Sequence, residues 1–279
     1  GIVALYSALL RKTGNGEKAL GIMAQAIEFD PLNYALLYER HLITGEHPIE
    51  EMQAEMQDVE NNYLEIATHY LNAGMYDEII RLLSGVREPQ NPLFLFYKAY
   101  ALSMNGEEEA ARSILASART GNYDYVFPYR IESEKVLRWT VASDSVSPYG
   151  HYLLGNLLYN NRPDEAMAAW EAAASSGASM PMVWRNLAFG QFHRQKNVGK
   201  AIETLTRAIN ASPDHPLWYD ELFTYYDAST RDPKECLAIL ETHEEVVRRN
   251  VSAPKGLVKL YNLNGDYDQA IQLLNSHHF

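Results

Sequence analysis

Residues 152–170 read YLLGNLLYNNRPDEAMAAW, and residues 184–208 read WRNLAFGQFHRQKNVGKAIETLTRA. Each stretch places a small residue in a first apolar segment and alanines in a second, with a polar turn between the two. The small residues, Gly155 and Ala188, lie 33 positions apart. Self-similarity at such a period indicates stacked helix pairs, because one pair cannot bury its apolar stripe alone.

The same period recurs between Trp184 and Trp218, which lie 34 residues apart. A helix–turn–helix unit of this length, with a small residue in its first helix and alanines in its second, resembles the tetratricopeptide repeat. No useful stretch alternates as a strand would. The sequence therefore predicts an all-α fold, a right-handed superhelix (α-solenoid) of about eight tetratricopeptide-like helix pairs.

The helix pairs outside this stretch are less regular. We expect them at residues 2–33, 33–58, 60–85, 93–119, 216–249 and 256–275. The period breaks after Gly121, and a single amphipathic helix is expected at about 131–142. One continuous solenoid is thus predicted in three regions: N-terminal repeats at 1–120, an irregular segment with one helix at 121–147, and C-terminal repeats at 148–279.

The composition excludes several classes of protein. The 24 Lys and Arg against 36 Asp and Glu give a formal net charge of −12 at pH 7. This balance argues against nucleic acid, whose phosphates need clustered Lys and Arg, and against an anionic membrane surface. No apolar run approaches the roughly 18 residues of a transmembrane helix. Cys236 is the only cysteine, so an intrachain disulfide and a cysteine-based metal site are excluded.

Catalytic and cofactor motifs are not apparent. His243-Glu244-Glu245 lacks the second histidine of a zinc-protease helix, and His277-His278 are adjacent, so they do not share a helix face. There is no phosphate-cradling glycine loop and no nucleophile elbow. We expect a chain that is not an enzyme and carries no metal or cofactor.

Both ends of the sequence resemble the interior of a repeat array. The opening stretch Ile2–Leu5 has neither the basic leader nor the cleavage site of a signal peptide, and neither end shows the polar outer face of a capping helix. We therefore expect a piece of a longer protein, and the sequence leaves its localisation open.

Several strings resemble one family beyond the generic repeat. They are Phe127-Pro128-Tyr129-Arg130 with Glu132, Glu134 and Leu137; Tyr152–Tyr159 with Trp170-Glu171; Val183–Ala188; and Glu221-Leu222. Together they resemble the C-terminal repeat region of large bacterial proteins of uncharacterised function, whose N-terminal half is β-rich and similar to galactose mutarotases. The resemblance covers most of the chain, is strongest from Phe127 to Leu222, and implies a link to carbohydrate.

A candidate ligand groove follows from the repeat. The first helix of each pair lines the concave wall of such a superhelix, with exposed positions at i, i+4 and i+7. The groove residues selected this way are Tyr100, Tyr152, Asn156, Tyr159, Arg185, Phe189, Tyr219 and Tyr226. Tyrosine combines apolar area with a hydrogen-bonding tip, which suits peptides and sugars alike. For each ring, packing between repeats is an equally good interpretation.

Further polar residues have two possible interpretations. Arg130, Glu132 and Glu134 lie in the irregular segment, where they form either a polar pocket or, as we favour, an ion pair that fixes a bend. Arg185-Asn186 either contacts a ligand or caps a neighbouring helix. A clamp for a C-terminal carboxylate is not expected, because the matching Lys and Asn positions lie in distant repeats.

The leading hypothesis is a non-enzymatic helical-repeat scaffold that binds a protein or peptide segment, or the N-terminal domain of the same protein, through the aromatic groove. The alternative is the accessory half of a carbohydrate-active bacterial enzyme, which contributes contacts to an oligosaccharide. A third interpretation is a spacer that binds nothing.

Overall fold

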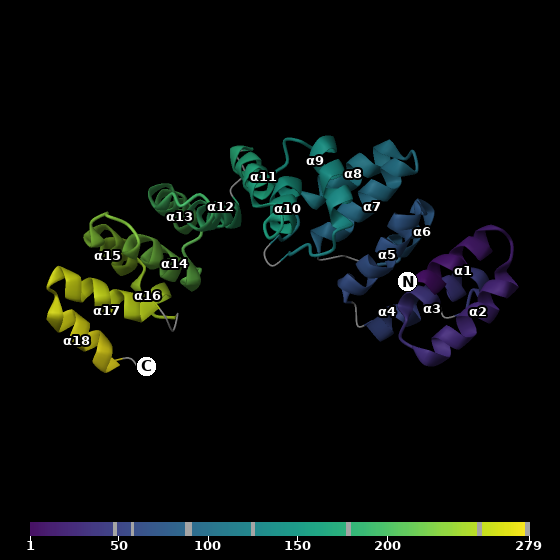
Figure 1. Ribbon diagram of the computed structural model, residues 1–279, viewed down its shortest axis with the longest axis horizontal. Coiled ribbons are helices and arrows are strands. Elements are labelled where there is room, and N and C mark those ends of the chain that lie inside the picture. The colour runs from purple at the N-terminus through teal and green to yellow at the C-terminus, as the bar shows by residue number, and fades with distance from the viewer. Residues whose placement is uncertain are drawn as a thin grey trace. The chain divides into compact units, whose positions relative to one another are not determined.

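The computed structural model describes residues 1–46, 49–56, 59–86, 91–123, 126–176, 180–249 and 253–276. Every regular element in these ranges is a helix (Figure 1), and the predicted all-α class is confirmed. The chain divides into two compact units, residues 1–153 and 154–279, and the division falls inside one helix, α10 (Pro148–Leu158).

Residues 1–153 contain nine helices before α10 within the described ranges. They are α1 (Ile2–Lys12), α2 (Gly16–Phe29), α3 (Tyr34–Thr44), α4 (Ile49–Met56), α5 (Glu60–Ala73), α6 (Tyr76–Ser84), α7 (Pro92–Met104), α8 (Glu108–Ala118) and α9 (Ser133–Ser143). The first helices α1, α3, α5 and α7 each contact the next first helix, and α1, α3, α5 and α7 also contact the second helix of their own pair. The single helix of the irregular segment, α9, packs on α7 in the place of a further first helix.

Residues 154–279 continue with helix pairs. The described elements are α11 (Pro163–Ser175), α12 (Pro181–His193), α13 (Val198–Ala211), α14 (Pro216–Asp227), α15 (Pro233–Thr242), α16 (Glu244–Val247), α17 (Ala253–Asn264) and α18 (Tyr267–Ser276). The pairs expected at 216–249 and 256–275 are present. The one-turn helix α16 was not expected. It follows His243, whose backbone leaves helical geometry at the end of α15, and it packs against α14 and α15.

Proline, asparagine and aspartate mark where these helices begin. Pro92, Pro181 and Pro216 occupy the first turns of α7, α12 and α14, where a missing N–H costs no hydrogen bond. The Asn197 side chain caps α13 by accepting from the Lys200 N–H. At the other end of a helix, Gly74 closes α5 in a left-handed conformation that L side chains rarely adopt.

Small residues lie where two helices cross. A Cβ atom added to Gly155 would overlap the indole ring of Trp170 in α11, so only glycine fits there. Ala188 in α12 is fully buried, as are Ala67 in α5 and Ala99 in α7. The close approach at Gly155 explains why a small residue stands there. In the described part of the chain, no helix combines the length and the apolar character needed to cross a membrane.

Candidate functional site

A cluster of polar and aromatic side chains forms on the first helices of residues 154–279. We call it the Arg185 cluster. Its members are Asn156, Tyr159, Trp170, Arg185, Asn186, Phe189, Glu221 and Tyr225. α10 supplies Asn156, α12 supplies Arg185, Asn186 and Phe189, and α14 supplies Glu221 and Tyr225. The repeat places these helices side by side, which is why residues far apart in sequence meet.

Asn156 lies at the centre of the cluster. Its Oδ1 accepts one hydrogen bond from Trp170 Nε1 at 3.1 Å and another from Asn186 Nδ2 at 2.9 Å. Both neighbours can only donate through these nitrogens, so they fix the orientation of the Asn156 amide. The Nδ2 of Asn156 is buried and has no hydrogen-bond partner among the described residues. An unpaired buried N–H is costly, so an acceptor on a ligand that reached this donor through a side-chain movement would be favoured.

Arg185 joins the cluster to α14. Its Nε donates to Glu221 Oε2 at 3.0 Å, and its Nη2 pairs with Glu221 Oε1. Its Nη1 donates to Asn186 Oδ1 at 3.2 Å, and the guanidinium lies 5.1 Å from the centre of the Phe189 ring. The two charged side chains keep 27% and 23% of their surface exposed, so the pair can be reached from solvent. Asn186 does not cap a helix. Its side chain accepts from Arg185 and donates to Asn156, so it links these two residues.

Aromatic rings surround these polar groups. Tyr159 stacks on Trp170 at 5.1 Å and meets Phe189 edge-on at 5.8 Å, and Phe192 stacks on Tyr225 at 4.3 Å. The Tyr225 ring is 1% exposed, and its hydroxyl has no hydrogen-bond partner in the described chain. Burial raises the pKa of Tyr225, and the nearby Glu221 carboxylate raises it further, so the hydroxyl stays protonated.

The other predicted groove tyrosines are packing residues. Tyr219 is fully buried, and its hydroxyl donates to the Pro213 carbonyl at 2.8 Å. Tyr226 is also buried, and its hydroxyl donates to Glu235 at 3.4 Å. Their positions on α14 point toward neighbouring helices, so a ligand could not touch them without rearrangement. We leave both out of the proposed binding face.

Two predicted groove residues lie in residues 1–153, and both are buried. Tyr152 has no exposed surface. Tyr100 in α7 meets Tyr76 and Trp139 edge-on, at 6.0 and 5.5 Å, and Lys135 lies over its ring. Because α9 supplies Trp139 and Lys135, Tyr100 is covered by the irregular segment of the same chain.

The residues of the candidate polar pocket reach separate partners. Arg130 donates to the Asn61 carbonyl at 3.1 Å and lies 3.8 Å from the Glu65 carboxylate. Glu132 accepts from the Asn72 side chain at 3.2 Å, whereas Glu134 pairs with a residue of its own helix, Arg138, at 2.7 Å. The predicted arrangement, in which these three residues share one pocket or one ion pair, is therefore not what the structure shows. Arg130 and Glu132 instead tie their segment to α5.

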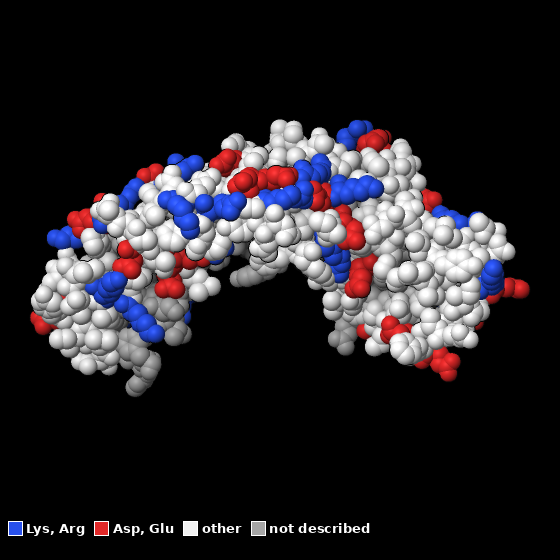
Figure 2. Space-filling model, viewed as in Figure 1, with Lys and Arg blue, Asp and Glu red and all other residues white. Residues whose placement is uncertain are grey.

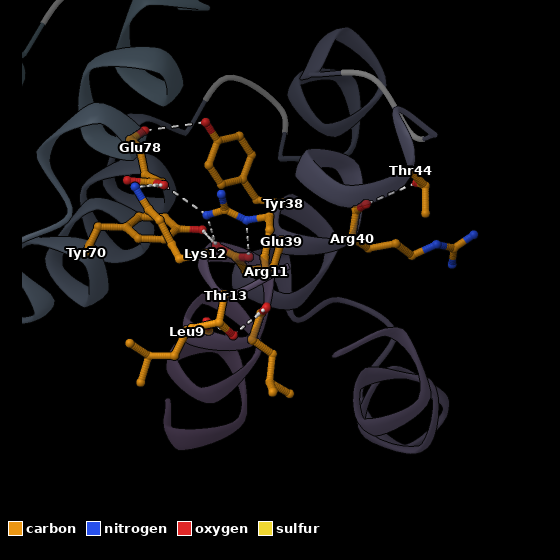
Figure 3. Close-up of polar contacts among 11 residues, drawn as sticks. Leu9, Arg11, Lys12, Thr13, Tyr38, Glu39, Arg40, Thr44, Tyr70 and Glu78 are labelled. Carbon is orange, nitrogen blue, oxygen red and sulfur yellow. Dashed lines mark hydrogen bonds and ion pairs between the residues drawn. The ribbon is translucent and has the colours of Figure 1, made fainter. Parts of the chain in front are cut away.

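A buried ionic network in residues 1–153 was not predicted (Figure 3). Arg11 in α1 donates to both carboxylate oxygens of Glu39 at 2.9 and 3.1 Å, and to Glu78 at 3.0 Å. Lys12 pairs with Glu78 at 2.8 Å, and Tyr70 donates to Glu39 at 2.6 Å. Glu39 has no exposed surface. We call these five residues the Arg11 network, and they connect α1, α3, α5 and α6.

The network has little signature in the sequence. Arg11 lies 28 positions from Glu39 and 67 from Glu78, so no local spacing rule links them. The one available signal is that Glu39 lies three positions after Leu36, on the apolar stripe of α3. A charge on such a stripe indicates a buried partner, because an unpaired buried carboxylate is very costly.

The charged surface is mixed. In the face drawn in Figure 2, Lys and Arg side chains lie among Asp and Glu, and no large field of positive charge is seen. Among the described residues, no group of three or more His, Cys, Asp or Glu is placed to hold a metal ion. His277 and His278 lie outside the described residues.

Comparison with known proteins supports the repeat. Residues 156–216 match the family model described as tetratricopeptide repeat. Similar solved structures include the C-terminal part of a TPR repeat-containing protein from Cytophaga hutchinsonii, with 15% identity, a TM-score of 0.43 and coverage of 96% of this chain and 92% of that one. YrrB, described as a TPR protein with an unusual peptide-binding site, shares 18% identity at a TM-score of 0.35, over 78% and 89% of the two chains.

A third similar structure is the APC/C hetero-tetramer Cut9-Hcn1, with 16% identity and a TM-score of 0.39 over 91% of this chain. This chain spans about half of that one, 54% of its length. Identities and TM-scores this low assign no function. The family match concerns residues 156–216, and this stretch holds Asn156, Arg185, Asn186 and Phe189 of the Arg185 cluster.

Proposed function

We propose that this chain is a non-enzymatic repeat scaffold that binds an extended protein segment on the Arg185 cluster. The observation that carries the proposal is the buried, unpaired Nδ2 of Asn156 next to a partly exposed guanidinium and aromatic rings. Stacking uses only the faces between neighbouring repeats. A scaffold therefore also needs a surface that contacts its partner.

The chemistry of the cluster fits a peptide main chain. Asn156 can donate to a carbonyl oxygen of the ligand through its unpaired Nδ2. Glu221 already neutralises Arg185, so the face has no strong preference for a charged ligand. Phe189 and Tyr159 offer ring surface for an apolar side chain. The expected ligand is therefore an extended segment with main-chain polar groups and at least one apolar side chain.

A binding screen tests this proposal. The chain would be titrated against an array of short synthetic peptides and, in parallel, an array of oligosaccharides. We expect peptide binding that weakens about tenfold or more in Arg185→Ala and Phe189→Ala, as for contacts worth over 1 kcal/mol. Arg207→Ala is the matched control, because Arg207 lies exposed on the second helix α13.

Two outcomes would count against the proposal. Peptide binding that is unchanged in both cluster variants would place the ligand elsewhere on the chain. Binding of an oligosaccharide, with the same sensitivity to Arg185→Ala and Phe189→Ala, would favour the carbohydrate-related alternative instead.

A further inference from the structure

The connection between α8 and α9 is unusually long. It runs from residue 119 to residue 132, whereas helix–helix connections in bundles usually take about 2–8 residues. Loops of this length without secondary structure of their own are commonly functional. Its described C-terminal part together with the first residue of α9, residues 126–133, we call the strap.

From Val126 to Arg130 the strap is extended, and it has two different sides. Val126 and Pro128 are buried, and the Arg130 side chain is 12% exposed. Phe127, Tyr129 and Ile131 alternate with them and are mostly exposed. A period of two is that of an extended chain lying on a surface, with one side inward and the other in solvent.

The inward side of the strap is held by one face of α5. Arg130 contacts the Asn61 carbonyl and the Glu65 carboxylate, and Glu132 accepts from Asn72. Asn61, Glu65 and Asn72 are separated by four and seven positions, so they lie on one side of the helix. At the end of the strap, Ser133 shares a hydrogen bond of 2.8 Å with Tyr97 of α7.

The strap contacts one face of α5 in the way that a bound peptide contacts a helical receptor. Arg130 ends the extended part of the strap, and Glu132 follows in the turn that leads into α9. The partners of both side chains come from a regular helix face. The ion pair between Arg130 and Glu65 is weak, since Glu65 is 67% exposed and the distance between the two side chains is 3.8 Å. Exposed charge pairs of this kind contribute little to stability, so the strap can be exchanged without unfolding the helices beneath it.

We propose that the face of α5 marked by Asn61, Glu65 and Asn72 is a second peptide-binding site, and that the strap is its resident intramolecular ligand. An external segment that is extended up to an Arg and then turns, with a Glu two residues after that Arg, takes the same contacts and competes with the strap. This site is separate from the Arg185 cluster, so the inference does not depend on the proposed function.

The strap is covalently attached to the chain, and this decides how well an added peptide competes with it. A tethered segment acts at a high effective concentration, so a free peptide of the same sequence binds weakly while the strap is in place. Weakening the strap's own anchors leaves the α5 face intact and raises the fraction of open sites. The apparent affinity for an added peptide then rises in proportion to that fraction.

The test uses the full chain and a fluorescently labelled peptide with the sequence of residues 126–133. Peptide binding would be followed by anisotropy, and opening of the strap by hydrogen exchange of its amides. In the double variant Arg130→Ala and Glu132→Ala, we expect faster exchange in the strap and about tenfold tighter peptide binding. The double variant Arg112→Ala and Glu109→Gln, on the exposed side of α8, is the charge-matched control and should behave as wild type.

A third variant separates a binding role from a structural one. Asn72→Ala changes an exposed residue on α5 and should leave the fold intact. Added to the strap double variant, it should weaken peptide binding, and a peptide with Ala in place of the Glu should show no further loss. The proposal is wrong if the strap opens and the peptide still does not bind, or if removing both anchors leaves the strap's exchange unchanged.

Discussion

Two first helices, α7 in residues 1–153 and α12 in residues 154–279, hold the same place in a helix pair but differ in what covers them. Both begin with proline, and each packs on the second helix of its own pair. In α7, Phe96, Tyr97 and Tyr100 are all buried. In α12, Arg185 and Phe189 keep part of their surface in solvent.

The difference follows from the irregular segment. α9 and the strap supply contacts to the side of α7 that a regular array would leave open, through Trp139 on Tyr100 and Ser133 on Tyr97. The sequence of α7, PLFLFYKAYALSM, is accordingly apolar nearly all round, whereas α12 carries an Arg-Asn pair. An apolar first helix thus indicates a covered face, and a polar pair indicates an open one.

The largest expected effect concerns the Arg11 network, which is confined to residues 1–153. Arg11→Ala leaves Glu39 buried without its bidentate partner, so we expect a loss of about 3–5 kcal/mol in the free energy of unfolding. Urea denaturation followed by circular dichroism measures it. Arg40→Ala, which removes only an exposed pair with Glu46, is the control and should cost under about 1 kcal/mol. Equal losses in the two variants would show that burial of the network contributes nothing.

The next effect tests the helix crossing beneath the Arg185 cluster. Gly155→Leu should overpack the contact with Trp170 and cost about 1–3 kcal/mol. It should also weaken peptide binding, because Trp170 Nε1 helps to hold Asn156. Gly21→Ala is the control: its site in α2 has open space and helical geometry, so we expect a gain of up to about 1 kcal/mol. A stable Gly155→Leu variant with wild-type binding would contradict the crossing geometry.

Acidification should change the stability contributions of Glu78, in residues 1–153, and Asp220, in residues 154–279, in opposite directions. Burial raises the pKa of Glu78, but hydrogen bonds from Lys12 and Arg11 outweigh it, and the pKa is lowered overall. The stability that Glu78 contributes is therefore present above the ordinary carboxyl pKa and is lost as the pH falls through the lowered one. Burial raises the pKa of Asp220 in α14, so its contribution is present at low pH and is lost as the pH rises through that raised value.

Urea denaturation from about pH 7 down to about pH 3 checks this difference. Glu78→Gln should reduce the loss of stability at acid pH. Asp220→Asn should remove the opposing contribution of Asp220 at low pH. If Glu78→Gln leaves the pH profile of unfolding unchanged, the acid sensitivity lies in other carboxylates.

The sequence predicted the fold more fully than the site, for a physical reason. Helix pairs depend on local spacing, so the interval between Gly155 and Ala188 sufficed to predict them. Exposure depends on what packs over a helix, which is why Tyr219, with no local signal to separate it from Phe189, was selected as a groove residue. The Arg11 network joins helices distant in sequence, and no periodic pattern encodes such contacts.

The smallest expected effect tests the two sides of the strap. Ile131→Ser changes a side chain that is 65% exposed, so the free energy of unfolding should change by less than about 0.5 kcal/mol. Val126→Ser changes a side chain on the inward row that is 8% exposed, and we expect a loss of about 1 kcal/mol or more. Denaturation of both variants in parallel measures the difference. An equal loss would mean that the outward residues Phe127, Tyr129 and Ile131 are also covered in solution. The difference between α7 and α12 would then involve more than the inward contacts of the strap.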